Sequence, residues 1–396
     1  MPKLAGENKC TGCSACYSIC SKKAIHMLAN KEGFAYPQID SSKCISCGLC
    51  ERVCPIINPN HQESIKPASY LIQNKNELER EESTSGGAFS LIAKYVINRG
   101  GVVFGVCIDE SFSVKHISVE KIEHLNLFRN SKYVQSNVGE SFKDAYHCLS
   151  NNKPVLFSGT PCQINGLKAF LDFKKCDTNL LITIDVICHA VPSPLLFKKY
   201  IDFKARKYSF DKIVFRDKKY GYSCSCLSLF KNDKRVYSAT SQLDEYMRLF
   251  LNNIGLRKSC YMCESQPFTH NSDFTLWDCW NPNALSSKKH DNRGTTNLIA
   301  WSAQARRIIQ EIDSSCIVTK VPFEKQYPGE RKHVFALKED RERFFDDLNE
   351  LPLSSFFNKY TPVTFRIWFK EKIRLFLVKI HLHDVVRKIV LRSRSK

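Results

Sequence analysis

Two runs of closely spaced cysteines near the start of the chain limit its possible folds more than any other feature. CTGCSACYSIC begins at Cys10 and CISCGLCERVCP begins at Cys44, and both follow the spacing C-x2-C-x2-C-x3-C. Zinc sites use pairs of cysteines that are separated by wider gaps. Three thiolates at this short spacing, with a fourth from elsewhere, instead suit a cubane [4Fe-4S] cluster. The runs therefore predict two such clusters within residues 1–60, with a pair of zinc sites as the alternative.

The fourth cysteine of each run is expected to serve the cluster of the other run. This exchange is typical of two-cluster bacterial ferredoxins, whose halves are related by pseudo-symmetry. We therefore expect an α+β ferredoxin module at the start of the chain. The first cluster would take Cys10, Cys13, Cys16 and Cys54 as ligands, and the second would take Cys44, Cys47, Cys50 and Cys20.

The composition indicates a reducing compartment and more than one globular core. Nineteen cysteines among 396 residues, with no N-terminal secretory signal, argue against a disulfide framework. A hydrophobic content of 43% is enough for two or three cores. No stretch approaches the roughly eighteen apolar residues that a membrane span needs. We expect a cytoplasmic protein, with any membrane contact limited to the inner membrane surface.

The middle of the chain alternates between helix and strand patterns. Apolar runs over 102–108, 154–158 and 179–188 read as strands, and amphipathic segments between them read as helices. One of these helices follows a Gly-Gly entry at Gly86 and Gly87. This alternation predicts an α/β region with a mostly parallel sheet.

Four further cysteines could form a third metal site at one edge of that sheet. Cys162 follows one predicted strand, Cys188 ends the next, and Cys260 and Cys263 form a C-x2-C pair. Thiols at the carboxyl ends of neighbouring parallel strands meet at the same edge. The residues alone leave three readings open: a third [4Fe-4S] cluster, a zinc site on the Cys260 and Cys263 pair with His270, and unconnected core cysteines.

Seven segments together resemble one family, the coenzyme F-420 hydrogenase/dehydrogenase beta-subunit family. The resemblance covers roughly residues 68–320, and the ferredoxin module stands in front as it does in many members. The segments are STSGGAFS, GTPCQINGL, CHAVPSP, IVFRDKKYGY, SCYMC, SDFTLWDCW and DNRGTTNLI, in this order.

The resemblance implies an iron–sulfur flavoprotein. Members bind FAD beside a [4Fe-4S] centre and pass electrons between clusters and a two-electron acceptor. That acceptor is coenzyme F-420 in some members and a chlorophyll-type or other organic substrate in others. Bacterial members are often associated with surface-polysaccharide pathways. For this chain the resemblance favours the third cluster on Cys162, Cys188, Cys260 and Cys263, and it implies FAD as a further cofactor.

The flavin imposes its own requirements on the residues around it. A pyrophosphate needs backbone N–H donors at a helix start, a phosphate or ribose can be held by a second polar turn, and a cation near N1 stabilises the reduced ring. Asp278 is retained from the family pattern, and His189 could donate a proton to the substrate. The N–H donors for the pyrophosphate are expected from Ser83, Thr84, Ser85, Gly86 and Gly87. The second polar turn is expected at Asp291, Arg293, Gly294, Thr295 and Thr296. The candidates for the cation near N1 are Arg216 and Lys218.

Each flavin role has a structural alternative. The helix start could be an ordinary capped helix and the second turn a surface loop. The basic pair could face solvent, and His189 could be a histidine whose hydrogen bonds are satisfied within the fold.

The end of the chain is strongly basic. The formal net charge is +19, and residues 363–396 hold ten Lys or Arg against two acids. A helix over 363–392 would place Arg366, Lys370, Arg374 and Lys388 along one stripe, and its aromatic residues would form an apolar face beside that stripe. Such a helix suits a membrane surface or the groove of a partner, or it packs on its own domain with the basic side in water. No nucleic-acid recognition motif accompanies the charge.

These observations divide the chain and leave three functions open. We expect four parts: a ferredoxin domain (1–60), the family's N-terminal domain (66–150), its C-terminal flavin and cluster domain (151–325) and a basic helical extension (326–396). The first function is an FAD- and [4Fe-4S]-dependent reductase or dehydrogenase that acts on an organic acceptor and receives electrons from a redox partner such as a ferredoxin. The others are an electron-transfer subunit that feeds a separate catalytic partner, and a non-catalytic interaction or sensor protein.

Overall fold

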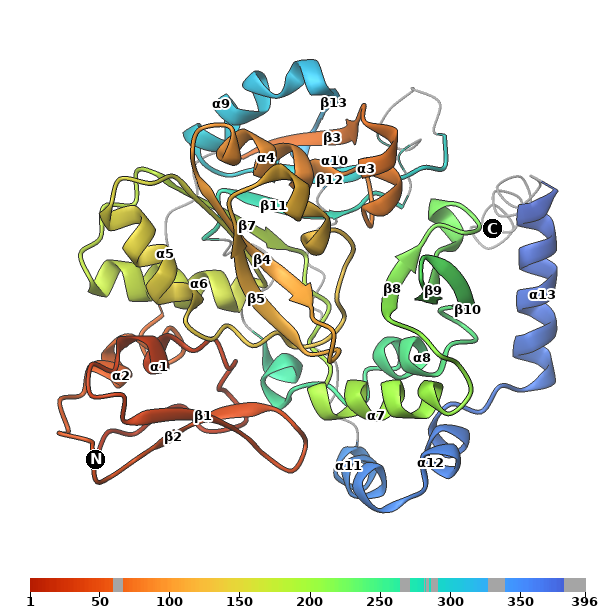
Figure 1. The fold of residues 1–396 in the computed structure, drawn as a ribbon, viewed down its shortest axis with the longest axis horizontal. Coiled ribbons are helices and arrows are strands. Elements are labelled where there is room, and N and C mark those ends of the chain that lie inside the picture. Colours follow the sequence, from red (N-terminus) through yellow and green to blue (C-terminus); the bar gives the residue numbers. More distant parts are fainter. Residues whose placement is uncertain are drawn as a thin grey trace.

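The computed structural model describes residues 1–59, 67–263, 271–280, 282, 285, 291–326 and 339–380 (Figure 1). The N-terminal part contains α1 (Ala15–Ile19), the antiparallel pair β1 (Ile25–Ala29) and β2 (Ala35–Ile39), and α2 (Leu49–Arg52). The two cysteine runs adopt matching backbones. Ser14 and Gly48, which precede the third cysteine of each run by two residues, both have a φ of 69°. The expected two-fold repeat is therefore present in the backbone.

The central sheet has eight strands in the order β13-β3-β12-β11-β7-β6-β4-β5. Its centre is parallel, because β4, β6, β7 and β11 all run in one direction, whereas each of the other four pairings is antiparallel. The parallel sheet predicted from the sequence is thus confined to the centre of a mixed sheet. The strands are β3 (Ala68–Asn74), β4 (Val102–Ile108), β5 (Val114–Val119), β6 (Val155–Ser158), β7 (Leu181–Val186), β11 (Phe274–Asp278), β12 (Thr296–Ala300) and β13 (Cys316–Val321).

Helices cover both faces of this sheet. One face buries Leu91, Ile92 and Ile308 together with β3, β7, β11 and β12. The other face buries Phe142 and Ile164. The helical elements of this region are α3 (Glu77–Glu82), α4 (Ala88–Ile97), η1 (Ile122–Phe128), α5 (Ser141–Ser150), α6 (Pro161–Phe173), α9 (Ala303–Glu311), η5 (Asp313–Ser315) and α10 (Phe323–Gln326).

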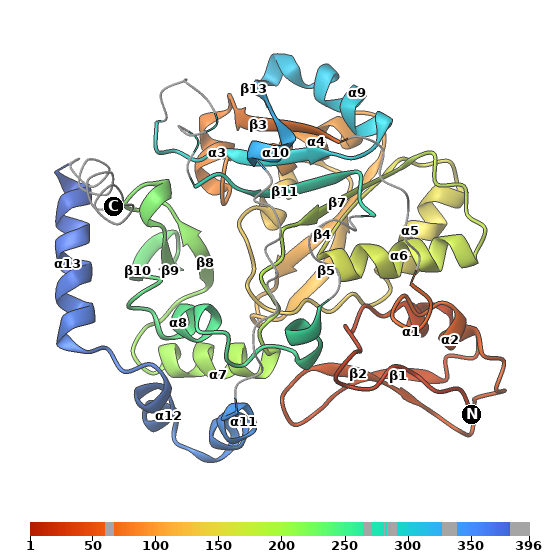
Figure 2. The same ribbon diagram turned by 180° about the vertical axis from the view of Figure 1, so that it is seen from behind.

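The ferredoxin module shares a core with the sheet region. Cys13, Ala15 and Ile19 belong to the same buried cluster as Phe142 and Ile164 of α5 and α6. Figure 2 shows α1 and α2 below α6. The module is therefore packed against the sheet region through α1 and α6.

A second lobe lies beside the sheet (Figure 1). Its antiparallel sheet, in the order β10-β9-β8, shares an aromatic core with the surrounding helices. The described helices include none that is long and apolar enough to cross a membrane. The lobe consists of α7 (Pro194–Ala205), β8 (Lys212–Asp217), η2 (Tyr222–Cys224), β9 (Cys226–Lys231), β10 (Lys234–Thr240), α8 (Glu245–Leu251), η3 (Lys258–Met262), α11 (Arg341–Glu350) and α12 (Leu353–Tyr360), and α13 (Phe365–Lys379) follows at its edge.

Candidate iron–sulfur and flavin sites

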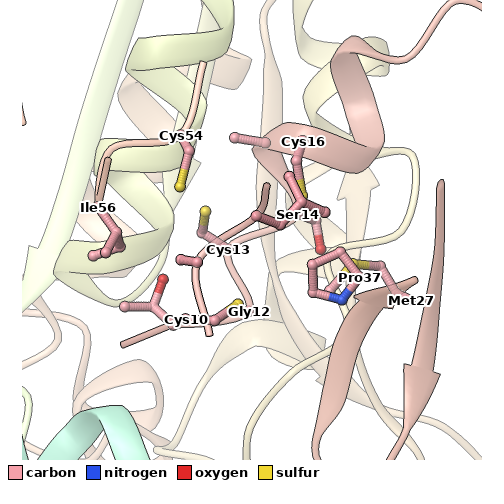
Figure 3. Close-up of a pocket in the computed structure, with 13 residues that line it drawn as sticks. Cys10, Gly12, Cys13, Ser14, Cys16, Met27, Pro37, Cys54 and Ile56 are labelled. Atoms are coloured by element: carbon pink, nitrogen blue, oxygen red, sulfur yellow. The ribbon is translucent and has the colours of Figure 1, made fainter. Parts of the chain in front are cut away.

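The first cysteine set surrounds one pocket of the ferredoxin module. Figure 3 shows Cys10, Cys13, Cys16 and Cys54 around this pocket, together with apolar neighbours such as Met27. Burial, with a further contribution from the neighbouring thiols, raises the pKa of Cys13 to about 12, and it raises the pKa of Cys16 and Cys54 as well. Four thiols that surround one pocket are a donor set that fits an iron–sulfur cluster, which binds cysteines as thiolates.

The second cysteine set lines another pocket in the same module. Cys20 lies there with Cys44, Cys47 and Cys50, and Ile25 and Leu49 form apolar walls. The last cysteine of each run thus lies with the first three of the other run. This is the arrangement that the pseudo-symmetry of the runs predicts.

The third cysteine set comes from four places in the chain. Cys162 is the second residue of α6, Cys188 follows β7, and Cys260 and Cys263 lie in and directly after η3. Burial raises the pKa of Cys162, Cys188 and Cys260, and the charges of the other cysteines in this set contribute to the rise for each of the three. The four thiols are therefore neighbours. His270 lies outside the described residues.

The donor atoms of this set are all thiols. Among the described residues, no group of three or more Cys, His, Asp or Glu side chains is arranged to hold a metal ion. A [4Fe-4S] cluster binds each of its four thiolates through a different iron, so its ligands stand further apart than those of a zinc ion. The donor chemistry of all three sets fits four-iron clusters.

The first and third sets lie next to each other. The charge of Cys162 contributes to the raised pKa of Cys13. A Cβ atom added to Gly166 of α6 would lie 2.8 Å from the Cβ and 3.0 Å from the Sγ of Cys13. Helix α6, which begins at the third set, therefore contacts Cys13 of the first set directly through the backbone at Gly166.

Arg257 lies between the two sets, and the sequence analysis missed it. Its side chain is completely buried. The guanidinium donates to the backbone carbonyl of Cys10 (2.8 Å), to Oε1 of Gln135 (2.8 Å) and to the carbonyl of Ala35 (3.1 Å). Its Nη2 also lies 3.8 Å from the Sγ of Cys10, and its charge affects the pKa of Cys162 and Cys260.

No carboxylate in the described part of the chain forms an ion pair with Arg257. A buried charge is costly unless an opposite charge accompanies it. Anionic clusters on the surrounding thiolates would supply that opposite charge. The only signal in the sequence is an arginine three residues before Cys260, and this signal becomes informative only once the fold brings Cys10 to it.

The two polar turns expected around the flavin pack directly against each other. The backbone N–H of Gly86 donates to Oγ1 of Thr296 (2.9 Å), and the hydroxyls of Ser85 and Thr296 are 2.8 Å apart. Gly294 has a φ of 105°, and a Cβ there would lie 2.4 Å from the carbonyl oxygen of Ser85. The sequence analysis thus identified two segments that meet in space.

Several of the polar atoms expected to bind flavin are used within the protein. The ammonium of Lys218 donates to the carbonyls of Arg80 (2.5 Å), Ser85 (3.0 Å) and Arg293 (2.7 Å), and burial lowers its pKa to about 8. Lys218 therefore holds the two turns together. Four other residues of the two turns form hydrogen bonds within the protein: Ser83 with Glu79, Thr84 with Ser131, Thr295 with Gln73, and Arg293 with Glu77. Gly87 is the N-cap of α4 and has a φ of 83°.

Arg216 and Asp278 form a buried pair between β8 and β11. Nη1 of Arg216 donates to Oδ2 of Asp278 (2.9 Å), the hydroxyl of Tyr222 donates to Oδ1 (3.0 Å), and the guanidinium carbon lies 4.6 Å from the centre of the Trp280 ring. The Nη2 of Arg216 is buried and has no hydrogen-bond partner among the residues that the structure describes. This unused donor fits a group that carries an acceptor or negative charge, as a flavin ring does at N1.

His189 lies beside the third cysteine set. Its Nε2 is 2.7 Å from Oδ1 of Asn253, and its ring packs edge-on against Phe250. These contacts orient the imidazole within the fold. The proton-donor role expected from the sequence stays a prediction.

The fold and the cysteine sets define a class of protein, and comparisons with known families agree. Residues 9–56 match a 4Fe-4S dicluster domain, and residues 152–326 match the family described as the C terminus of the coenzyme F420 hydrogenase/dehydrogenase beta subunit. These matches confirm the resemblance seen in the sequence for two regions of the chain. The first region is a ferredoxin-type domain with two cysteine runs, and the second is similar to the C-terminal region of an F420 hydrogenase/dehydrogenase beta subunit.

Individual relatives are distant. One subunit of the F(420)H(2) dehydrogenase of Methanosarcina mazei is 21% identical over 199 residues, which are 47% of this chain and 56% of that protein. An uncharacterized polyferredoxin-like protein of Methanocaldococcus jannaschii is 29% identical over 102 residues, 21% of this chain and 61% of that one. The chain thus spans less than two thirds of these relatives. A chain of the F420-reducing [NiFe] hydrogenase complex from Methanosarcina barkeri aligns with a TM-score of 0.47 and 12% identity, covering 76% of this chain and 92% of its own.

Proposed function

We propose that this chain is an iron–sulfur flavoprotein oxidoreductase that moves electrons between [4Fe-4S] clusters, FAD and an organic acceptor. The observation that carries the proposal is the adjacency of the first and third cysteine sets, with Cys13 next to α6 and Arg257 buried between them. Structural metal sites need no such adjacency. Electron transfer does, because each transfer step has to be short.

The twelve cysteines of the three sets are the proposed ligands. Cys10, Cys13, Cys16 and Cys54 hold the first cluster, Cys20, Cys44, Cys47 and Cys50 hold the second, and Cys162, Cys188, Cys260 and Cys263 hold the third. When bound, the clusters supply one-electron transfer and FAD supplies the exchange between one and two electrons. The contact of the ferredoxin module with α6 keeps two of the three sites at a fixed separation.

The flavin site is proposed at the junction of β8, β11 and the two polar turns. Arg216 presents its free Nη2 to the flavin, Asp278 fixes the guanidinium, and Trp280 adds a half-exposed aromatic surface. Ser83, Thr84, Ser85, Gly86 and Gly87 with Arg293, Gly294, Thr295 and Thr296 form the adjoining wall. Lys218 acts there as a positioning residue, because its three carbonyl contacts hold the turns in place.

The electron donor and the acceptor are proposed by class only. The name of the Methanosarcina mazei relative refers to reduced coenzyme F-420, which supports a deazaflavin or another planar organic two-electron acceptor. A small acidic redox protein such as a ferredoxin would suit the other end, where the second cysteine pocket lies in the ferredoxin module. His189 is the proposed proton donor to the acceptor. The place of action is expected to be the cytoplasm.

The iron-to-flavin ratio of anaerobically purified protein tests the proposal. About twelve irons per FAD are expected for three four-iron clusters and one flavin. About eight irons without flavin, in fully folded protein, would leave only the ferredoxin module and overturn the flavoenzyme. Cys162→Ser should lower the iron content by about four atoms, whereas Cys176→Ser, which changes a cysteine outside the three sets, should leave it unchanged.

A second candidate is an electron-transfer subunit that feeds a separate catalytic partner. The relative in Methanosarcina mazei is named as one subunit of a dehydrogenase, and this observation favours the candidate. Reduced protein that is reoxidised only when a partner protein is added would support it. A protein that binds clusters and flavin but shows no turnover with any acceptor or partner would point to the non-catalytic sensor role.

A further inference from the structure

Helix α13 presents its apolar side to solvent. Phe365 is 76% exposed, Phe376 is 61% exposed and Phe369 is 51% exposed. Trp368, Ile373 and Ile380 are also exposed. These residues recur at spacings of three, four and seven, which place them along one side of a helix. The side that faces the protein contains Glu371, the one residue of α13 that is fully buried.

One hydrogen bond attaches the helix to the second lobe, since Nη2 of Arg374 donates to the carbonyl of Ser223 (3.0 Å). Within the helix, Nη1 of Arg374 lies 3.2 Å from Oε1 of the buried Glu371. Ile367, Leu375 and Val378 are half-buried beside them. The attachment therefore uses one side of the helix and leaves the aromatic side without a partner in the described part of the molecule. Figure 1 shows α13 at the edge of the molecule, beyond β10.

The exposed side is also basic. Arg366, Lys370, Lys372 and Lys379 are all exposed, whereas the single acid of α13, Glu371, points inward. The sequence from 381 to 396 adds five Lys or Arg against one Asp. Arg366 and Lys370 border the aromatic side, whereas Lys372 and Lys379 lie within it, and the Lys372 ammonium is 5.5 Å from the centre of the Trp368 ring. The aromatic side therefore carries cations without a counter-charge on the same side of the helix. A surface that would match this side of the helix has an anionic outer layer with an apolar layer directly beneath it.

We propose that α13 binds the anionic surface of a lipid bilayer. Amphipathic helices with aromatic residues on one side and Lys or Arg at its borders lie in the plane of the headgroups. Each cation near an anionic leaflet adds to the attraction, and the long side chains of Lys and Arg reach the headgroups while their stems stay apolar. This arrangement explains both features of the surface, whereas a nucleic acid would use the charge and leave most of the apolar side exposed.

The inference does not depend on the proposed redox activity. It places the second lobe, to which β8 belongs, at a membrane surface. No described helix is suited to cross the membrane. Binding would be reversible, since one amphipathic helix anchors more weakly than a transmembrane segment.

Co-sedimentation of the full chain with vesicles tests the proposal. We expect binding to phosphatidylcholine vesicles that contain about 30% phosphatidylglycerol, at least about tenfold weaker binding to pure phosphatidylcholine, and weakening by high salt. F365S/F376S should reduce binding to the mixed vesicles at least about tenfold, because it removes two of the most exposed rings. K370E/K372E should weaken it similarly by reversing two charges.

The matched control removes apolar surface elsewhere. Leu78 is 77% exposed and Leu127 is exposed too, so L78S/L127S should leave vesicle binding within about twofold of the wild-type protein. Equal binding of wild type to both vesicle types, or no binding to either, would overturn the proposal. So would a dimer that F365S/F376S dissociates in protein without vesicle binding, since a second copy would then cover the helix. The far-UV circular dichroism of each variant verifies that it is folded.

Discussion

At the scale of single residues, buried groups without a protein partner carry the most information. Among the described residues, Arg257 has no carboxylate partner and Nη2 of Arg216 has no acceptor. Both groups cost free energy in the protein alone. Each also lies where a cofactor is proposed, and the bound cofactor would supply the partner that the protein does not. Both arginines can be tested by substitution.

Replacing Arg257 by Met should lower the reduction potential of at least one cluster by on the order of 50–100 mV. The positive charge near Cys10, Cys162 and Cys260 favours the reduced, more negative cluster, and its removal withdraws about 1–2 kcal/mol of that stabilisation. Arg257→Lys should leave the reduction potential close to the wild-type value, because lysine retains the positive charge. Anaerobic redox titration followed by electron paramagnetic resonance measures the shift.

The neighbouring Lys258 provides the control for Arg257. Its ammonium lies 3.8 Å from Glu7 and 3.9 Å from Glu32, so its charge is already accompanied by carboxylates. Lys258→Met should shift the potentials by less than about 20 mV. If R257M assembles all its clusters and titrates like the wild-type protein, the buried guanidinium has only a structural role.

Replacing Arg216 by Met should weaken FAD binding about ten- to a hundredfold while the iron content stays the same. A hydrogen bond to a charged group contributes about 1.5–3 kcal/mol, and Nη2 is the donor that the protein leaves free. Fluorescence titration of the flavin-free protein with FAD measures the change. Arg235→Met is the control, because Arg235 pairs with Asp217 on the same small sheet, and it should bind FAD normally.

At the scale of elements, local patterns predicted the strands and helices well. The strand expected over 102–108 is β4, and the helix expected after Gly86 and Gly87 is α4. The antiparallel flanks of the sheet were not foreseen, because strand direction depends on how distant segments pair. The same reason explains Lys218, which reads as a free cation in the sequence but is enclosed by carbonyls from two other segments.

At the end of the chain, the spacing of apolar and basic residues predicted a helix but not its orientation on the protein. The pattern predicted a helix over 363–392, and α13 covers Phe365–Lys379, while residues 381–392, including Lys388, lie outside the described residues. Periodicity identified an apolar and a basic side. It could not tell which side faces the protein, since Arg374 of the basic stripe is the residue that contacts Ser223.

The approach of α6 to the ferredoxin module should not tolerate a side chain at position 166. A Cβ there would lie 2.8 Å from the Cβ of Cys13 and 3.3 Å from Cε2 of Phe142, so a side chain has little room. Gly166→Val should therefore cost about 1–3 kcal/mol of unfolding free energy and reduce the iron content of the purified protein by up to about four atoms. Chemical denaturation and iron analysis measure both quantities. Gly6→Ala, where a Cβ would meet nothing within 4 Å, is the control and should change neither quantity.

At the scale of the whole molecule, the ferredoxin module connects the two lobes. Its α1 packs against α6 of the sheet region, and the turn between β1 and β2 reaches the second lobe. There Glu32 accepts two hydrogen bonds from Arg341 of α11, each 2.7 Å long, and the hydroxyl of Ser193 donates to the carbonyl of Glu32. The module is thus held both by the sheet region and by the second lobe, which keeps its cysteine sets at a fixed distance from the third set.

The buried pair of Glu32 and Arg341 makes this connection testable. Both side chains are almost inaccessible to solvent. Glu32→Gln should lower the free energy of unfolding by about 3–5 kcal/mol, because it leaves the Arg341 guanidinium buried without its counter-charge. E32Q/R341M should recover much of that loss, since the apolar replacement removes the unpaired charge. Lys31→Met, which breaks the exposed pair with Asp346, should cost less than about 1 kcal/mol. Denaturant unfolding monitored by circular dichroism measures all three. If E32Q is as stable as the wild-type protein, the Glu32–Arg341 ion pair does not stabilise this connection, and the packing on α6 with the hydrogen bonds of Ser193 and Arg257 holds the module in place.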